Sequence, residues 1–146
     1  MVGWFAPLLD LGTSAPDFEL HDQDGHPVRL SELRGSNVVL VFYPGDDTPT
    51  CTRQLCEFRD RWDAARERNA TVLGISPWSA ERKAKFRAKY SFPFPLLADP
   101  GQRVAALYNT KGLWVRRTVY LIGPDGVIRY AQRGKPAPEE VLAAAQ

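Results

Sequence analysis

Residues 38–56 read VVLVFYPGDDTPTCTRQLC, an apolar run followed by a turn-rich loop and a helical pattern. The unbroken apolar run from Val38 to Tyr43 predicts a buried strand. Both cysteines of the chain, Cys51 and Cys56, come after it, one at the start of the expected helix and one inside it. A strand, a loop and a helix in this order place Cys51 near the carboxyl end of the strand, where α/β proteins usually hold their reactive groups.

Cys51 stands where thiol chemistry is favoured. A helix N-terminus presents unsatisfied N–H groups and the positive end of the helix dipole, which stabilise a thiolate, the nucleophilic form of cysteine. On a helical wheel Cys51 lies within roughly 40° of Leu55, Phe58 and Trp62 and continues their apolar stripe. We therefore expect a reactive thiol at the floor of a pocket, with a structural buried cysteine as the alternative.

Cys56 lies about 140° around the helix from Cys51, toward its polar face. In an intact helix the Cα atoms of the two cysteines would be about 8 to 9 Å apart. A disulfide needs a Cα separation below about 7 Å, so a bond between Cys51 and Cys56 would require the first helical turns to unwind. A surface thiol without a role is the alternative for Cys56.

The rest of the chain alternates strands with helices. Strands are predicted at residues 18–20, 28–30, 71–76, 96–98, 118–122 and 127–131. Helices are predicted at 52–68, 79–90, 102–108 and 138–145, with a short helical turn capped by Ser31 and ending at Gly35. This order predicts an α/β, thioredoxin-like fold with a central mixed sheet flanked by helices. The length suits a single domain, residues 1–146, with residues 1–11 as an N-terminal arm.

The composition excludes fewer classes of function than the segment around the two cysteines does. The formal net charge of +2 implies no acidic partner, and no apolar run approaches the length of a membrane span. The apolar start, residues 1–10, lacks the basic region of a signal peptide. Two cysteines without a secretory signal indicate a reducing compartment, which we take to be the cytoplasm.

Two segments of the chain could suggest other binding sites. His21 and His26 could suggest zinc, but they flank a turn, and C-x-x-x-x-C inside a helix is poor metal spacing, so surface histidines and no metal are expected. The basic run from Arg82 to Lys89 could contact nucleic acid. A solvated helix face is the better interpretation, because aromatic residues are sparse there and the net charge is small.

Pro44, Thr48 and Cys51 form the pattern P-x-x-x-T-x-x-C, and Cys56 extends it with C-x-x-x-x-C. This segment resembles the active site of peroxiredoxins, specifically the peroxiredoxin Q group, also called bacterioferritin comigratory proteins. Three further segments agree with the resemblance: Ala15–Leu20, Asp22–Gly25 and Arg117–Ile122. The similarity runs in order from about residue 12 to residue 128.

The resemblance implies a thiol-dependent peroxidase that reduces hydrogen peroxide and alkyl hydroperoxides without a metal, haem or flavin cofactor. Cys51 would attack the peroxide and become a sulfenic acid. Cys56 would resolve it as an intramolecular disulfide, and a thioredoxin-like dithiol would reduce that disulfide. The expected protein is a monomer that binds neither nucleic acid nor membrane.

The other site residues follow from what peroxide cleavage needs. Donors must face the peroxide oxygens as charge shifts between them, and the Thr48 hydroxyl with the backbone N–H groups of Thr50 and Cys51 can provide them. By resemblance, Pro44 would shield the thiol from water, and Gln54 occupies a position where relatives carry Glu or Gln. Thr50 stands where close relatives usually have Gly, which changes the pocket wall.

A permanent positive charge would favour the thiolate and stabilise the leaving oxygen. Arg116 and Arg117 are both candidates. The resemblance selects Arg117, because the active-site arginine of the family lies three positions before a strand aromatic, here Tyr120.

Two other function classes remain open from the residues alone. A thioredoxin-type disulfide oxidoreductase shares the fold, but its C-x-x-C signature has two intervening residues where this chain has four. The other class is a redox-sensing binding domain whose oxidised form changes a contact with a partner.

Overall fold

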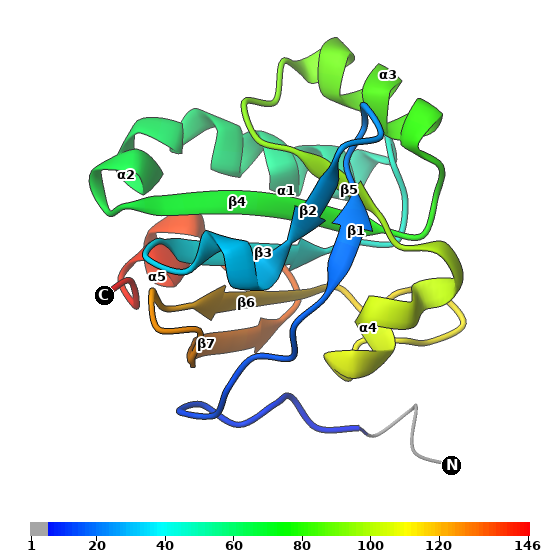
Figure 1. The fold of residues 1–146 in the computed structure, drawn as a ribbon. Helices are drawn as coiled ribbons and strands as arrows, with labels where there is room; N and C mark the ends of the chain where they lie inside the picture. The colour runs from blue at the N-terminus through cyan, green and yellow to red at the C-terminus, as the bar shows by residue number, and fades with distance from the viewer. Residues whose placement is uncertain (1–5) are drawn as a thin grey trace.

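The computed structural model describes residues 6–146 (Figure 1). Its strands form one seven-stranded sheet in the order β2-β1-β5-β4-β3-β6-β7. The strands are β1 Glu19–His21, β2 Pro27–Arg29, β3 Asn37–Phe42, β4 Ala70–Ser76, β5 Leu96–Ala98, β6 Thr118–Ile122 and β7 Ile128–Arg133. The α-helices are α1 Pro49–Asp60, α2 Trp62–Glu67, α3 Ala80–Tyr90, α4 Arg103–Leu107 and α5 Pro138–Leu142, with 3-10 turns at Leu30–Leu33 and Pro100–Gln102.

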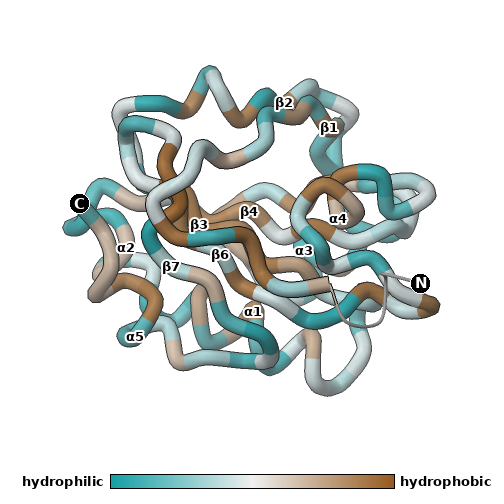
Figure 2. The backbone as a smooth tube through the Cα atoms, turned by 90° about the horizontal axis from the view of Figure 1, so that it is seen from below, coloured by the Kyte–Doolittle hydropathy of each residue, from teal (hydrophilic) through white to brown (hydrophobic). Residues whose placement is uncertain are grey.

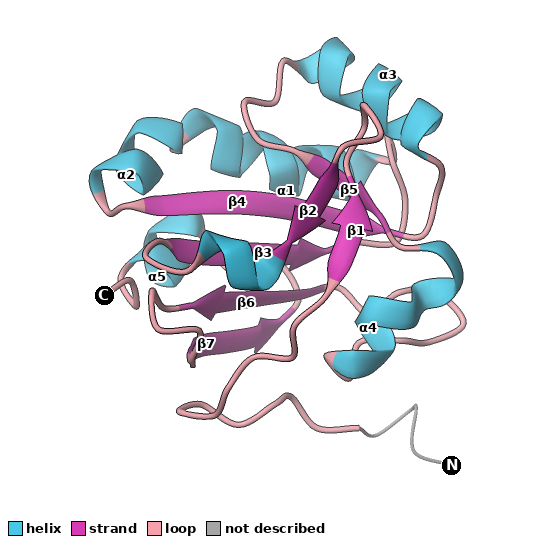
Figure 3. Ribbon diagram, in the orientation of Figure 1, coloured by secondary structure: helices cyan, strands magenta, loops and turns pink. Residues whose placement is uncertain are grey.

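The sheet is mixed, as the sequence predicted. β3 pairs with β4 and β4 with β5 in parallel, while β6 runs antiparallel to β3 and β7 antiparallel to β6. Every residue of β3 is buried, which fits a strand that lies in the middle of the sheet and is covered on both faces (Figure 3). The register pairs Phe42 with Thr118, so the carboxyl end of β3 lies beside the start of β6.

Alternate side chains of β3 enter two separate apolar clusters, as the two-residue period of a strand requires. Val39 and Val41 join one cluster, which buried side chains of α1, α2, α3 and α5 complete. Val38, Leu40 and Phe42 join the other, which includes residues of α4. Figure 2 shows the hydrophobic stretch of β3 enclosed by the surrounding elements.

Three of the predicted helical segments differ from the structure. The helix expected at 138–145 ends at Leu142. The helix expected at 52–68 begins earlier, at Pro49, and is broken at Arg61, whose φ of −110° and ψ of 20° separate α1 from α2. The 3-10 turn begins at Leu30 and not at a Ser31 cap; the Ser31 N–H donates to the Asp17 carboxylate at 2.8 Å. The predicted start of α3 is confirmed, because Ser79 precedes it and its hydroxyl accepts the N–H of Arg82 at 3.2 Å.

The basic run of α3 corrects another expectation. Its other charged side chains lie at least partly at the surface, but Lys83 is completely buried and forms an ion pair with Asp46 at 3.1 Å. The prediction of a solvated face was therefore wrong at this position. Lys83 precedes the buried Phe86 by three residues and lies on the same inward face of the helix.

The predicted N-terminal arm lies partly outside the described residues, which begin at Ala6. From there the chain follows the sheet edge: the Leu9 N–H donates to the Tyr120 hydroxyl at 3.1 Å, and the Gly12 N–H donates to the Ile128 carbonyl at 2.8 Å. Within residues 6–146, no helix combines the length and the apolar character that a membrane span requires.

Candidate active site

Cys51 lies in the first turn of α1, directly after the loop that leaves β3, and its side chain is fully buried in the apolar cluster of α1. Pro49 opens the helix, a position where the missing N–H of proline costs nothing. Thr48 precedes it with extended backbone, and its hydroxyl donates to the Gly45 carbonyl at 3.0 Å. The thiol thus faces the interior at a helix N-terminus, as the helical pattern predicted.

Arg117 contacts the sulfur of Cys51. Its Nη2 lies 3.2 Å from Sγ, and its Nη1 donates to Oε1 of Gln54 at 2.9 Å. Gln54 is itself fully buried, and its Nε2 donates to the Gly134 carbonyl at 3.4 Å. The side chain of Gln54 therefore links the guanidinium to the loop after β7 and holds it in place over the thiol.

Arg116 points elsewhere. Its backbone N–H donates to the Thr110 carbonyl at 2.8 Å, and its buried Nη1 has no hydrogen-bond partner among residues 6–146. The structure therefore brings together Cys51, Gln54 and Arg117 and leaves Arg116 outside this group. Adjacent residues of an extended chain project to opposite sides, which explains the division.

Cys56 is half-buried and packs against the same apolar cluster as Cys51, so the expectation of a polar surrounding is only partly met. Burial raises the pKa of the Cys56 thiol, the charge of Arg59 opposes this shift, and Asp60 adds to it. Both cysteines are free thiols in this structure. At neutral pH Cys56 is consequently held in its protonated, less nucleophilic form.

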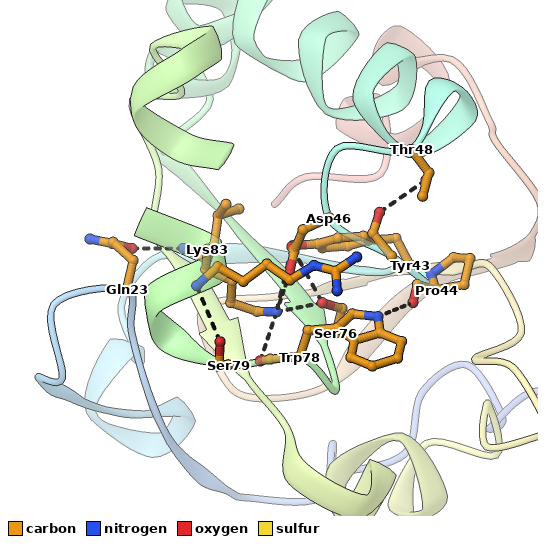
Figure 4. A network of polar contacts seen from close by, with 12 residues as sticks. Gln23, Tyr43, Pro44, Asp46, Thr48, Ser76, Trp78, Ser79 and Lys83 are labelled. Atoms are coloured by element: carbon orange, nitrogen blue, oxygen red, sulfur yellow. Dashed lines mark hydrogen bonds and ion pairs between the residues drawn. The ribbon is translucent and has the colours of Figure 1, made fainter. Parts of the chain in front are cut away.

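The remaining predicted site residues line the loop and the first helical turn. Thr48 and Thr50 are exposed, and Pro44 is half-buried beside the loop's contact with Trp78. The indole Nε1 of Trp78 donates to the Pro44 carbonyl at 2.7 Å (Figure 4). Trp78 was not among the residues that the sequence singled out.

A buried polar network under this loop was also missed (Figure 4). The Asp46 carboxylate accepts hydrogen bonds from the Tyr43 hydroxyl at 2.5 Å and from Lys83 Nζ at 3.1 Å, with the Ser76 hydroxyl at 3.5 Å. Burial lowers the pKa of Lys83, and the charge of Asp46 opposes that shift. Burial raises the pKa of Tyr43 well above its usual range. The sequence signal was the position of Lys83 on the apolar stripe of its helix.

The histidines do not assemble a site with the cysteines. Both are exposed, and within residues 6–146 the only cluster with metal-ligand spacing is Asp22, Asp24 and His26. One oxygen of Asp22 already accepts the backbone N–H groups of Asp24 and His26 at 2.9 Å each, which stabilises the turn before β2. The expectation of surface histidines is confirmed.

Comparison with known proteins agrees with the motif. The model of the AhpC/TSA family matches residues 11–131. A rice protein (Oryza sativa subsp. japonica) named peroxiredoxin Q, chloroplastic, is 39% identical over 133 residues, which are 88% of this chain. The chain spans 61% of the length of that relative. Peroxiredoxin Bcp of Bacillus subtilis is 35% identical over 127 residues, 81% of each chain.

Among solved structures, peroxidoxin BcpB from Mycobacterium tuberculosis superposes with a TM-score of 0.88 at 35% identity. The match covers 93% of this chain and 96% of the other. The thioredoxin-like fold predicted from the order of strands and helices is thereby confirmed. With the family match over most of its length and these relatives, the chain belongs to the AhpC/TSA family, among the peroxiredoxins named Q and Bcp.

Proposed function

We propose that the protein is a thiol peroxidase that reduces hydrogen peroxide and organic hydroperoxides through Cys51. The observation that supports this most directly is the guanidinium of Arg117, whose Nη2 lies 3.2 Å from the buried Cys51 sulfur. A fixed positive charge at that distance, together with the positive end of the helix dipole, stabilises negative charge at the reacting atoms. No metal, haem or flavin is needed for the reaction that follows.

In that reaction the Cys51 thiolate attacks one peroxide oxygen and forms an S–O bond. The O–O bond breaks, the leaving oxygen takes a proton and departs as water or an alcohol, and Cys51 becomes a sulfenic acid. Negative charge moves from sulfur to the leaving oxygen during this step. Arg117 can stabilise both ends of that shift, because its fork of donors spans neighbouring acceptors.

The loop and the first turn of α1 complete the proposed pocket. The Thr48 hydroxyl would turn from Gly45 to the peroxide, and the first-turn N–H groups of Thr50 and Cys51 lack partners within the helix. Pro44 would keep water from the thiolate. Gln54 would act on Arg117 by orienting its guanidinium.

Turnover requires the second cysteine. The Cys56 thiol would lose its proton and attack the sulfenic sulfur, and the sulfenic hydroxyl would leave with that proton as water, which forms the Cys51–Cys56 disulfide. A thioredoxin-type dithiol would then reduce that disulfide while its own thiols are oxidised. Both cysteines lie within the single helix α1, so this step needs the helix to unwind locally. We propose that the protein works as a monomer in the cytoplasm; the rice relative is named as a chloroplast protein.

Peroxide consumption coupled to a thioredoxin system tests the proposal. The wild-type protein should consume hydrogen peroxide, and Cys51→Ser should remove this activity. Cys56→Ser should react with about one equivalent of peroxide and then turn over poorly, which a thiol count before and after one equivalent would show. Full activity in Cys51→Ser would refute the function, and insulin reduction without peroxide consumption would favour a disulfide oxidoreductase instead.

A further inference from the structure

The loop from Pro44 to Asp47 connects the buried strand β3 to the cysteine-bearing helix. Side chains of the β4–α3 region hold it at several points (Figure 4). Trp78 donates to the Pro44 carbonyl at 2.7 Å, and Lys83 and Ser76 hold the Asp46 carboxylate. The loop that carries Pro44 and leads into the proposed peroxide-binding residues is thus fixed from outside the motif.

Of these contacts, the Asp46–Lys83 ion pair has the largest desolvation cost in free energy. The side chain of Lys83 is 0% exposed and that of Asp46 is 1% exposed. Removing two charges from water costs several kcal/mol per ion, and replacing such pairs by apolar residues is often neutral or even stabilising. Stability alone therefore does not account for the pair, whereas fixing one conformation of a segment is a documented use of buried polar contacts.

The geometry around Lys83 fits a fixing role. Its ammonium group has three donors, and besides Asp46 it donates to the Ser76 hydroxyl and to the Trp78 carbonyl, the latter at 3.2 Å. Two of these partners, Asp46 and Trp78, contact or belong to the loop. The Lys83 side chain on α3 therefore binds the loop directly through Asp46. It also binds Trp78, which donates to the carbonyl of Pro44, the first residue of the loop.

A second tie lies at the end of the loop. Asp47 has a φ of 59°, and its carboxylate accepts Lys89 Nζ and the Tyr90 hydroxyl of α3, each at 2.9 Å. The hydroxyl of the next residue, Thr48, donates back to the Gly45 carbonyl, and its own carbonyl accepts the Thr52 N–H of α1 at 2.8 Å. Within the loop, Asp47 is the last residue whose side chain bonds to α3. Along α1 the next such bond comes near the end of the helix, where the Arg59 guanidinium donates to the Tyr90 carbonyl at 2.8 Å. Among the described residues, the first turns of α1, which must unwind for Cys56 to reach Cys51, have no hydrogen bond to α3.

We propose that Lys83 is a positioning residue for the peroxidase site. Acting through Asp46, it holds the loop in the conformation that presents Pro44 and Thr48 to the peroxide. It thereby favours the folded, peroxide-reactive state of Cys51 over the unwound state in which the disulfide forms. This inference rests on the proposed function and adds to it a control of the balance between the two steps.

The variant Lys83→Met keeps much of the side-chain length and removes the charge, leaving the Asp46 carboxylate without its ion-pair partner. That carboxylate should move toward water and carry the loop with it. Two rates change in opposite directions under the proposal. Oxidation of Cys51 by peroxide should slow by about tenfold or more, because misplaced binding groups lose reactivity. Formation of the Cys51–Cys56 disulfide should become several-fold faster, since the folded state resists unwinding less.

Stopped-flow measurement of both steps is compared across matched variants. Lys85→Met removes an exposed lysine two residues along the same helix, whose partner Glu81 is 3.8 Å away at the surface, and should leave both rates unchanged. Ile128→Ala removes apolar volume in the cluster on the other face of the sheet and should lower stability without changing either rate. Trp78→Phe removes one tie to the loop and should slow oxidation by a smaller factor.

The outcomes separate positioning from simple structural support. Opposite shifts of the two rates in Lys83→Met support the proposal, and the double variant Asp46→Asn with Lys83→Met should also oxidise slowly because the loop remains untied. If Lys83→Met loses stability but keeps wild-type rates of oxidation and of disulfide formation, as expected for Ile128→Ala, the proposal is overturned. If Lys83→Met does not fold, the double variant and Trp78→Phe decide, and wild-type rates in both overturn it.

Hydrogen exchange gives a readout that does not depend on peroxidase activity. In reduced Lys83→Met, the amides of residues 45–48 and of Thr50 should exchange faster while those of β3 and β4 stay protected. A wild-type protein that fails to consume peroxide would refute the proposed function, even with this exchange result. Unchanged exchange in an active enzyme would refute the role of Lys83 alone.

Discussion

The guanidinium of Arg117 lies against the sulfur of Cys51, with Nη2 at 3.2 Å from Sγ, although 66 positions separate the two residues in the chain. Sheet register creates this contact. Because Phe42 pairs with Thr118 across β3 and β6, the loop before β6, which carries Arg117 as its last residue, ends beside the carboxyl end of β3. The relative positions of Cys51 and Arg117 are thus set by the pairing of β3 with β6, two strands whose residues are all buried.

Arg117→Ala should lower the rate of Cys51 oxidation about a hundredfold, the order of loss seen on deleting one oxyanion donor. The substitution withdraws stabilisation from both the thiolate and the leaving oxygen. Raising the pH should recover only part of the rate, because deprotonating the thiol does not replace the charge on the leaving oxygen. Arg117→Lys should recover part of the charge effect without the forked hydrogen bonds. Stopped-flow oxidation rates against pH provide the measurement.

Arg116→Ala is the matched control for that experiment and should stay within a few-fold of the wild-type rate. Arg116 precedes Arg117 directly, and its guanidinium makes no contact with the thiol or with Gln54 among the described residues. A large loss of rate in Arg116→Ala together with a normal rate in Arg117→Ala would show that the assignment of the active-site arginine before β6 is wrong.

Gln54→Leu should reduce peroxide reactivity less than loss of the arginine itself. The change removes the hydrogen bond from Arg117 Nη1 at 2.9 Å and the link to Gly134, but it leaves the positive charge. We expect a fall of about tenfold in the oxidation rate, equivalent to about 1.4 kcal/mol, the order of one hydrogen bond to a charged group. A loss as large as that of Arg117→Ala would show that the arginine depends wholly on Gln54.

Peroxide treatment should produce an intramolecular Cys51–Cys56 disulfide with loss of helix around both cysteines. Non-reducing electrophoresis should show a monomer, and the intact mass should fall by about two hydrogens relative to the reduced protein. Amides from Thr52 to Phe58 should exchange faster in the oxidised form. A dominant intermolecular dimer, or unchanged exchange in this segment, would contradict local unwinding.

The reactivity of Cys56 should depend on pH in a direction set by its burial. Because burial raises its pKa in the folded state, the thiol keeps its proton at pH values where the unfolded chain loses it. The stability that Cys56 contributes is therefore complete below the pKa of the unfolded thiol and is lost as the pH rises through the folded value. In Cys51→Ser, alkylation of Cys56 should titrate at higher pH in the folded protein than in urea. Equal alkylation profiles in the two states would contradict this.

Much of this architecture could be predicted because its signals are local. The apolar run of β3, the Ser79 cap of α3 and the apolar stripe of α1 each report one element directly. The contact between Arg117 and Cys51 was predicted through resemblance alone, since no local pattern measures a distance between residues so far apart in the chain.

The features that were missed have physical reasons. Trp62 and Ala65 continue the apolar stripe past Arg61, so the pattern gave no sign that the helix breaks there. Lys83 was expected in solvent because a lysine is almost never buried unless it is paired with an opposite charge. Its partner Asp46 lies 37 positions earlier, and only the folded chain reveals the pair.

The break at Arg61 divides the helical segment after the loop into two separate helices. α1 contains both sulfurs, while α2 begins at Trp62 and contributes its buried Ala65 to the apolar cluster. Because α1 and α2 do not form one continuous helix, the N-terminal half of α1 can unwind while α2 stays packed against the core. Each catalytic cycle would then interrupt only a small, self-contained part of the fold, and the protein could be oxidised and reduced repeatedly without approaching global unfolding.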